Sequence, residues 1–305
     1  MTSETTSSPR APVVVTGANG FVGSYVTAAL VDRGVSVRAI VRRPRTAPDL
    51  PGVEEIVGEF HDRDVADRAC SGARAVVNTV HPMQDDDGPQ ESAVGWAAAL
   101  AEAARDAGVP LFVHVSTTSV YERKAGTPDV DEFSPLVDDD ANEYAVTKRD
   151  TELRLHEVDG ITRVLVRPTA ILGPGESSVW NTLQPESIRT EESARTDDPE
   201  RTFGWLHVHD LADLIADIAV GAIPLAQDPE QGPVPGLVTP VNAVTGNVRL
   251  REYLAPVCEA LGVEPVWETR EAFRAQLRAD RARAWGWSPK VSFEDAMAEL
   301  VTGLR

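Results

Sequence analysis

Lysine, cysteine and methionine are scarce in this sequence. Its 305 residues include lysine at positions 124, 148 and 290, two cysteines and three methionines. Cys70 and Cys258 lie far apart in helix-like segments, so we expect two buried thiols in a reducing compartment and no disulfide. Zinc-type ligand spacing is absent. The aspartate runs 85–87 and 138–140 read as solvated loop acids, and we predict no metal site.

Long apolar runs and positive charge are also missing. No apolar run reaches the ~18 residues that a membrane span requires, and residues 1–10 lack the apolar core of a signal peptide. We expect these ten residues to be a disordered leader and the protein to be cytoplasmic. The net charge of −19 argues against nucleic acid and anionic membranes as partners.

A glycine-rich turn follows the first apolar segment. Residues 13–15 are three valines, typical of a buried strand, and the helix-like segment 24–33 follows Gly17, Gly20 and Gly23. The first glycine permits a tight turn, the second lets a pyrophosphate approach the backbone, and the third lets helix and strand pack closely. We predict a dinucleotide site, with a purely structural turn as the alternative. The expected contacts are Gly17, Asn19, Gly20, Phe21, Val22 and Gly23.

Arginines end the second expected strand, residues 35–41. An acidic residue there would bind the ribose hydroxyls of NAD, but this chain has Arg42, Arg43 and Arg45. Guanidinium groups bind phosphate in forked geometry. We therefore predict NADP(H) in preference to NAD(H); solvated surface arginines are the alternative.

The next two strands, expected at 53–57 and 75–80, supply further nucleotide contacts. Glu59 and Phe60 follow the first of them and are expected to face the adenine. The end of the second is expected to pass beneath the cofactor, through Thr79, Val80 and His81. His81 is also a candidate for substrate contact, although a loop histidine before a proline more often lines a wall.

Tyr144 and Lys148 are four residues apart in a helix-like segment, and residues at this spacing share a helix face. A free tyrosine titrates near pH ~10, so a nearby cation would make it a better acid or base at neutral pH. An amphipathic surface helix is the alternative. Thr117 follows the expected strand 111–115, at the sheet edge where open α/β folds bind ligands.

Several motifs in this order resemble the extended short-chain dehydrogenase/reductase family, which includes nucleotide-sugar epimerases, dehydratases and ketoreductases. The resemblance covers nearly the whole chain. It implies that Tyr144 is the acid/base, that Lys148 holds the nicotinamide ribose and lowers the pKa of Tyr144, that Thr117 bonds the reacting oxygen, and that Pro168 lies by the nicotinamide. The motifs are the glycine turn, 116–121, Tyr144 with Lys148, 167–168 with 173–175, 206–212 and 286–290.

The chain also departs from the family pattern. Dehydratases carry an Asp-Glu pair where this chain has Thr118 and Ser119, so dehydration is disfavoured. Asparagines of many sugar-nucleotide enzymes are replaced by Ala170 and Gly95. The family often dimerises through the helices expected at 91–107 and 144–156, and we carry a homodimer over as an expectation.

Together these features predict an α/β fold, a doubly wound parallel (Rossmann) sheet with a smaller C-terminal substrate-binding lobe. We expect the Rossmann domain at 11–173 and 204–244 and the lobe at 174–203 and 245–305. Residues 176–202 show no period and are expected to be a flexible cover, while 248–261 and 271–284 are expected helices. Candidate substrate contacts are Thr118, His81, Trp180 and Trp205; packing is an equally good explanation for the two tryptophans.

The expected activity is NADPH-dependent reduction of a carbonyl of a small molecule, with Thr117, Tyr144 and Lys148 as the catalytic residues. Nucleotide sugars and secondary metabolites both stay open as substrates. An epimerase with retained NAD(P) is the first alternative, and a redox sensor that binds NADP without chemistry is the second.

Overall fold

The computed structural model describes residues 11–80 and 90–305, with the side chains of 90–93 excepted. Within these residues the main element is a seven-stranded sheet of order β10-β6-β5-β4-β1-β2-β3, and all its neighbouring strands are parallel. Its strands are β1 (Val13–Thr16), β2 (Val37–Val41), β3 (Val53–Val57), β4 (Ala75–Asn78), β5 (Leu111–Val115), β6 (Thr162–Pro168) and β10 (Val238–Ala243).

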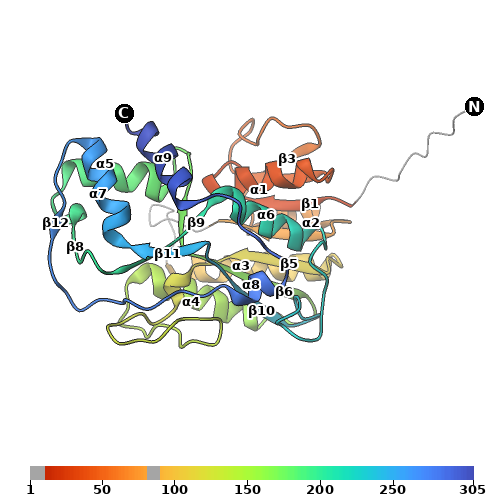
Figure 1. The fold of residues 1–305 in the computed structure, drawn as a ribbon. Coiled ribbons are helices and arrows are strands. Elements are labelled where there is room, and N and C mark those ends of the chain that lie inside the picture. The colour runs from red at the N-terminus through yellow and green to blue at the C-terminus, as the bar shows by residue number, and fades with distance from the viewer. Residues whose placement is uncertain (1–10, 81–89) are drawn as a thin grey trace, which may run out of the picture.

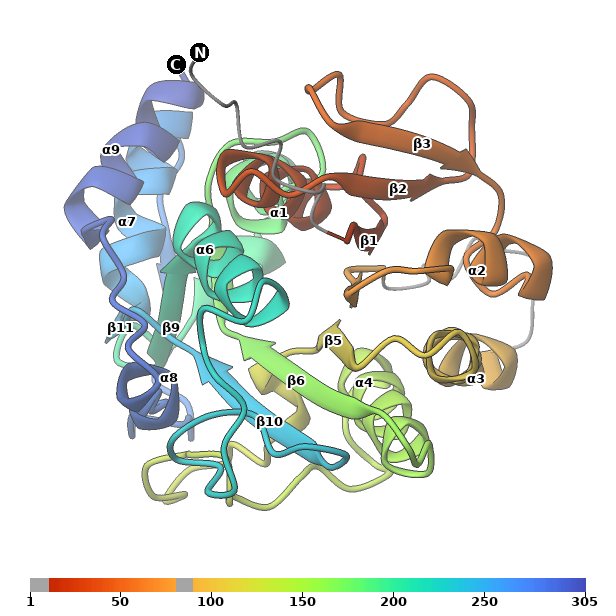
Figure 2. The ribbon, with the colours of Figure 1, turned by 90° about the vertical axis from the view of Figure 1, so that its right-hand side faces the viewer.

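Helices cover both faces of this sheet, as Figure 2 shows. The helices α1 (Phe21–Asp32) and α6 (Val208–Ala219) lie on one face, and α2 (Arg63–Cys70), α3 (Gln90–Asp106) and α4 (Glu143–His156) lie on the other. Because side chains alternate along a strand, Val13 and Val15 pack toward the first layer and Val14 toward the second. Most residues of the strands are therefore apolar, as expected of a sheet buried on both faces.

The strand order reverses between β1 and β4. The chain runs outward from β1 through β2 to β3, then returns to β4 and continues outward through β5 to β6. Loops on the two sides of such a switch point separate and leave a crevice at the carboxyl ends of the strands, where open α/β sheets bind ligands. The predicted doubly wound sheet is confirmed, and its switch point lies beside the glycine turn.

A smaller lobe packs at one end of the sheet and lies on the left in Figure 1. Its separate core includes Leu172, Ile188 and Tyr253. The elements are β7 (Ala170–Leu172), β9 (Thr202–His207) and β11 (Gly246–Arg249) in one small sheet, β8 (Thr196–Asp197) and β12 (Val266–Trp267) in another, and helices α5 (Gln184–Thr190), α7 (Leu250–Leu261) and α9 (Phe293–Gly303). Helix α8 (Asp280–Ala284) instead packs beside β10 of the large sheet.

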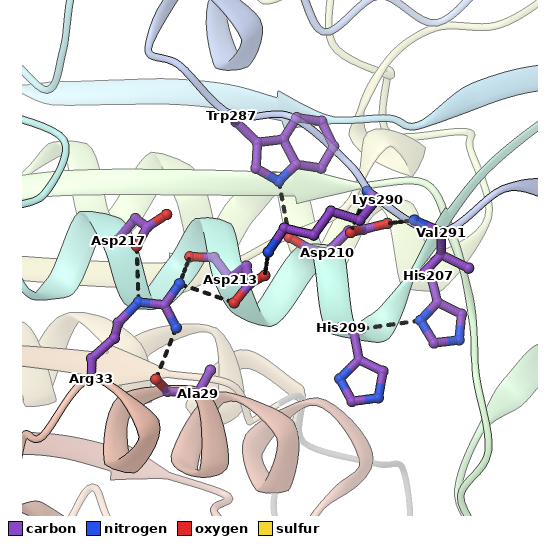
Figure 3. Close-up of polar contacts among 10 residues, drawn as sticks. All are labelled: Ala29, Arg33, His207, His209, Asp210, Asp213, Asp217, Trp287, Lys290 and Val291. Atoms are coloured by element: carbon purple, nitrogen blue, oxygen red, sulfur yellow. Dashed lines mark hydrogen bonds and ion pairs between the residues drawn. The ribbon is translucent and has the colours of Figure 1, made fainter.

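Helix α6 joins the segment before α9 to the Rossmann layer (Figure 3). The buried carboxylate of Asp210 accepts hydrogen bonds from the backbone N–H groups of residues 290 and 291 at 2.8 and 3.2 Å. The indole of Trp287 donates to the backbone oxygen of Asp210 at 2.9 Å. One turn on, Asp213 pairs with Arg33 of α1. Two motifs that are far apart in sequence, 206–212 and 286–290, are thus direct partners.

The helix expected at 271–284 is wrong over most of its length, because α8 covers only its last five residues. Phe273 and Leu277 are four residues apart, which is a helical spacing. Both side chains are buried, but the segment that carries them is not helical. Val130 donates from its N–H to the Gln276 carbonyl at 2.8 Å, and Thr202 donates to the Phe273 carbonyl at 2.9 Å. Long-range backbone pairing replaces the local bonds of a helix.

Other expectations need smaller corrections. Residues 176–202, expected to be a cover without regular structure, contain α5 and a π-helical turn at Val179–Leu183. Residues 248 and 249, expected to be helical, belong to β11 and precede α7. None of the helices in the described residues is long and apolar enough to cross a membrane. The expected leader 1–10 lies outside the described residues.

Candidate active site

The glycine turn has no room for side chains. Gly17 has a φ of +64°, in the left-handed region, and a Cβ on it would meet Val80 Cγ2 at 2.9 Å. A Cβ on Gly23 would meet the Gly17 carbonyl carbon at 2.7 Å and Thr79 Oγ1 at 2.9 Å. The backbone of the turn therefore lies against the end of β4, as the glycine spacing predicts for a cradle that a phosphate can approach.

Helix α1 begins directly after this cradle. Gly20 is its N-cap and offers no side chain to the first turn, which also lacks acidic residues. The first N–H groups of a helix have no partner within it and carry partial positive charge. Phe21 packs against the backbone of Gly175, since a Cβ there would lie 2.8 Å from its ring. The residues present fit a dinucleotide pyrophosphate.

The three arginines after β2 are exposed at the sheet's carboxyl edge. Their loop is held by Glu55 of β3, whose carboxylate accepts hydrogen bonds from the N–H groups of residues 45, 46 and 47 at 2.8 to 3.0 Å. These bonds, that from Ala47 first, lower the pKa of Glu55. Arg45 has a φ of +60°. The loop geometry therefore keeps Arg42, Arg43 and Arg45 exposed just beyond the carboxyl end of β2.

The remaining expected nucleotide contacts differ in accessibility. Glu59 is exposed, whereas Phe60 is 7% exposed and its ring packs in the core, so only its backbone can meet an adenine. Thr79 lies at the turn and donates to the Thr16 carbonyl at 2.7 Å. Val80 also borders the turn. His81, expected to contact both cofactor and substrate, lies outside the described residues.

A buried polar network at the strand ends was missed from the sequence. Thr16 donates to Asn78 Oδ1 at 2.6 Å, and Asn78 Nδ2 lies 3.1 Å from His114 Nδ1. All three are at most 1% exposed. The network ties the tips of β1, β4 and β5 together beneath the crevice. Polar residues within otherwise apolar strands were the available signal.

The structure brings Thr117 and Tyr144 together. Thr117 follows β5, is 8% exposed, and begins a short 3₁₀ turn at Thr118–Val120 by accepting a hydrogen bond from the Ser119 N–H at 3.1 Å. Tyr144 lies in the first turn of α4, which Asn142 caps. Tyr144 is 43% exposed, and its phenol lies near enough to the Thr117 hydroxyl for that hydroxyl to lower the pKa of the phenol by hydrogen bonding. Both hydroxyls therefore lie at the tip of β5.

Lys148 lies one helical turn further along α4 and is only 4% exposed. Its ammonium donates to the carbonyl of Val115, the last residue of β5, at 3.0 Å. Burial lowers the pKa of Lys148 to about 8, and the carboxylate of Glu152 opposes this change. The side chain thus fastens α4 to the carboxyl end of β5.

The pKa of Tyr144 differs from expectation. Burial raises it above the ordinary value, and the hydrogen bond from Thr117 only partly opposes this. The lowering by Lys148 that the resemblance implied is not found in the protein itself, where the ammonium is bonded to Val115. A phenol with a raised pKa keeps its proton at neutral pH, as a proton donor must.

A second buried network supports α4 from behind. Arg167 of β6 forms two hydrogen bonds with Glu152, at 2.9 and 2.6 Å, and both side chains are at most 4% exposed. Arg167 also donates to the Tyr121 hydroxyl at 2.6 Å, and that hydroxyl donates to Asn242 at 2.8 Å. Removing one partner of such a pair would leave a buried charge uncompensated.

The other candidate residues are more deeply packed than a substrate contact requires. Thr118 is 2% exposed, and Pro168 is buried where β6 pairs with β10. Trp205 is 3% exposed and packs against Phe293 in the lobe core. Trp180 is half-buried and meets the rings of residues 203 and 253 edge-on. For both tryptophans the contacts favour the packing alternative.

Residues 13–220 match the NAD dependent epimerase/dehydratase family. The chain belongs to this family. It is an NAD(P)-dependent enzyme of the extended short-chain dehydrogenase/reductase type, and the matched span contains the glycine turn, Thr117, Tyr144 and Lys148.

Relatives within the family have several activities. The chain is 29% identical over 263 residues to a 3 beta-hydroxysteroid dehydrogenase/Delta 5→4-isomerase of Mycobacterium tuberculosis, covering 82% of this chain and 69% of that one. It is 29% identical over 258 residues to a 4-hydroxy-2-methyl-3-oxo-4-farnesyl-3,4-dihydroquinoline-1-oxide ketoreductase of Stigmatella aurantiaca, covering 82% and 73%.

Solved structures share the fold. A UDP-glucose 4-epimerase of Thermus thermophilus, solved in complex with NAD, superposes with a TM-score of 0.72 over 96% of this chain and 98% of that one. The two sequences are 21% identical. At this identity the likeness shows the shared architecture, and the activity must be argued from the site.

The phenol titration of the free protein tests the raised pKa of Tyr144. Burial raises the pKa of all four tyrosines above 10, so the near-ultraviolet phenolate absorbance of the folded protein should stay flat until the pH exceeds 10. A phenolate that appears near neutral pH and is missing from Tyr144→Phe would contradict this account.

Proposed function

We propose that this protein reduces a carbonyl group of a small-molecule substrate with NADPH. The observation that carries the proposal is the meeting of the Thr117 and Tyr144 side chains at the tip of β5. Two hydroxyl groups at one point, on the sheet edge that holds the glycine turn, can grip a single carbonyl oxygen. The dehydrogenase and ketoreductase names of the relatives support the same class of reaction.

Tyr144, Thr117 and Lys148 would each have a separate role in the reduction. The bound nicotinamide would supply the hydride. Tyr144 holds its proton at neutral pH and donates it from the phenol to the developing alkoxide. Because the Ser119 N–H already donates to Thr117 Oγ1, the Thr117 hydroxyl can turn its own proton from the Tyr144 oxygen to the substrate oxygen. Lys148, fixed on Val115, keeps the tyrosine's helix turn at the strand tip and adds positive charge behind it.

Reduction is favoured over the related reactions by what surrounds this pair. Thr118 and Ser119 supply no carboxylate for the second proton transfer of a dehydration. Ala170 and Gly95 lack the amide groups that many sugar-nucleotide enzymes offer, which weakens the epimerase alternative. A redox sensor that carries out no reaction would not require the Thr117 and Tyr144 hydroxyls together at the strand tip, with the buried ammonium of Lys148 beside them.

The preference for NADPH is part of the proposal. The supporting observation is the exposed group of Arg42, Arg43 and Arg45, with their loop anchored on Glu55. Guanidinium groups bind phosphate in forked, charge-assisted geometry. The three side chains would therefore stabilise the 2′-phosphate that distinguishes NADPH from NADH.

Tyr144→Phe tests the chemical assignment. The change removes the donated proton and little else, so turnover of a panel of small ketones and aldehydes should fall by about 10² to 10⁴-fold. NADPH affinity should change by less than about threefold, because the ring remains. Turnover is followed by loss of NADPH absorbance and affinity by fluorescence titration. Unchanged turnover would sink the assignment.

Arg42→Gln combined with Arg43→Gln tests the cofactor assignment. Losing two guanidinium groups should weaken NADPH binding by at least about tenfold and leave NADH binding nearly unchanged. Both dissociation constants are measured by calorimetry. Arg38→Gln is a control in the same strand, since Arg38 pairs with Glu54 and the backbone. Equal affinity of the wild type for NADPH and NADH would refute the preference.

A further inference from the structure

A recess of about 260 Å³ opens between the catalytic strand tip and the lobe. One wall comes from the loop after β5 and the other from the segments before β9 and after β12. Arginine is the most frequent residue in its lining, in a protein whose net charge is −19. The lining residues are Arg123, Asp197, Arg201, Thr202, Arg270, Glu271, Ala272 and Phe273.

Arg123 carries a positive charge that no carboxylate in the described residues neutralises. Its single hydrogen bond runs from Nη2 to Ser119 Oγ and is long, at 3.4 Å. The side chain is accessible to solvent, yet surrounding protein, and then the charge of Arg201, lower its pKa to about 10. Arg123 is therefore an exposed side chain in the wall of the recess, beside a second guanidinium.

Arg201 faces Arg123 from the lobe side, close enough for their charges to repel. One of its nitrogens pairs with Asp197 at 2.8 Å. Its Nε is buried and has no hydrogen-bond partner among the described residues. A buried donor without a partner costs free energy, so this guanidinium is incompletely bonded, and its side chain, 37% exposed, still offers other atoms to an anion in the recess.

The charges of the lining do not cancel. Three arginines stand against the carboxylates of Asp197 and Glu271, and Asp197 is already engaged by Arg201 and by the N–H of residue 198. Arg270 pairs with Glu268. The excess positive charge thus centres on Arg123 and on the unpaired side of Arg201. Guanidinium groups in this arrangement suit a carboxylate or a phosphate.

The recess adjoins the catalytic pair through a short chain of contacts. Arg123 donates to the Ser119 side chain, and the Ser119 N–H donates to Thr117 Oγ1 at 3.1 Å. Arg123 and Thr117 thus both bond to Ser119, so one short loop connects the recess to the strand tip. Arg123 and Arg201 come from separate segments, so their meeting was not visible in the sequence.

We propose that this recess binds an anionic group, a carboxylate or a phosphate, of the carbonyl substrate, with Arg123 and Arg201 as its ligands. This proposal rests on the proposed reductase function, because that function is the reason for expecting a carbonyl group on the molecule whose anionic group binds here. It narrows the substrate to an acidic carbonyl compound. Neutral ketones would be turned over without this anchor and with higher KM.

Binding of three probes to the NADP⁺-saturated protein tests this site without requiring turnover. Benzoate and phenyl phosphate carry the two candidate anions, and benzamide is the neutral counterpart of benzoate. Saturation with NADP⁺ blocks the nucleotide's own phosphate positions. Calorimetry should show at least one anion binding about tenfold or more tighter than benzamide, and which anion binds tells carboxylate from phosphate.

Substitutions then locate the site. Arg123→Gln should remove the anion preference, and Arg123→Lys should keep part of it because the charge remains. Arg201→Gln should act in the same direction. Lys124→Gln is the matched control: it removes one positive charge from the adjacent position, where the ammonium pairs with Glu122, and should leave binding unchanged.

Two results would overturn the proposal: no preference of the wild type for either anion over benzamide, or an equal loss in Arg123→Gln and Lys124→Gln. A different result would refute the proposed reductase function. An anion preference without NADPH-dependent turnover of any carbonyl would leave the site standing and refute the reductase; turnover of neutral ketones without an anion preference would do the reverse.

Discussion

The bond from the buried Lys148 ammonium to the Val115 carbonyl is the contact on which the rest of the site depends. It joins the first half of α4 to the last residue of β5, and thereby fixes where Tyr144 can stand relative to Thr117. Lys148 is only 4% exposed, and the loss of hydration lowers its pKa. Burying this ammonium therefore costs free energy. The sequence has three lysines, and the side chain of this one is held in the interior by its bond to the Val115 carbonyl.

Further buried charge keeps that helix in place. Glu152 lies one turn after Lys148 and is bonded to Arg167 of β6, the strand beside β5. The same carboxylate opposes the lowering of the Lys148 pKa. Helix α4 is thus anchored to two neighbouring strands by two charged side chains, and the hydroxyl pair sits at the end of this frame. The nucleotide cradle depends on a different constraint, the absence of side chains at Gly17 and Gly23.

Much of the fold could be predicted because short stretches of sequence determine its strands, turns and helix starts. Glycine spacing and valine-rich strands each act within a few residues. The segment 271–284 failed because Phe273 and Leu277 mimic a helix face while distant strands take their backbone bonds. The pKa direction of Tyr144 failed for a related reason: burial is set by tertiary packing. Arg123 and Arg201 could not be paired before the lobe was placed.

The central claim is that the Thr117 and Tyr144 hydroxyls act on one substrate oxygen as a unit. A double-mutant cycle measures this directly, with kcat/KM for carbonyl reduction determined in Thr117→Val, Tyr144→Phe and the double variant. Residues that act as a unit are strongly non-additive, so the double variant should be no more than about threefold slower than Tyr144→Phe. Losses that multiply in full would show two independent roles and contradict the account.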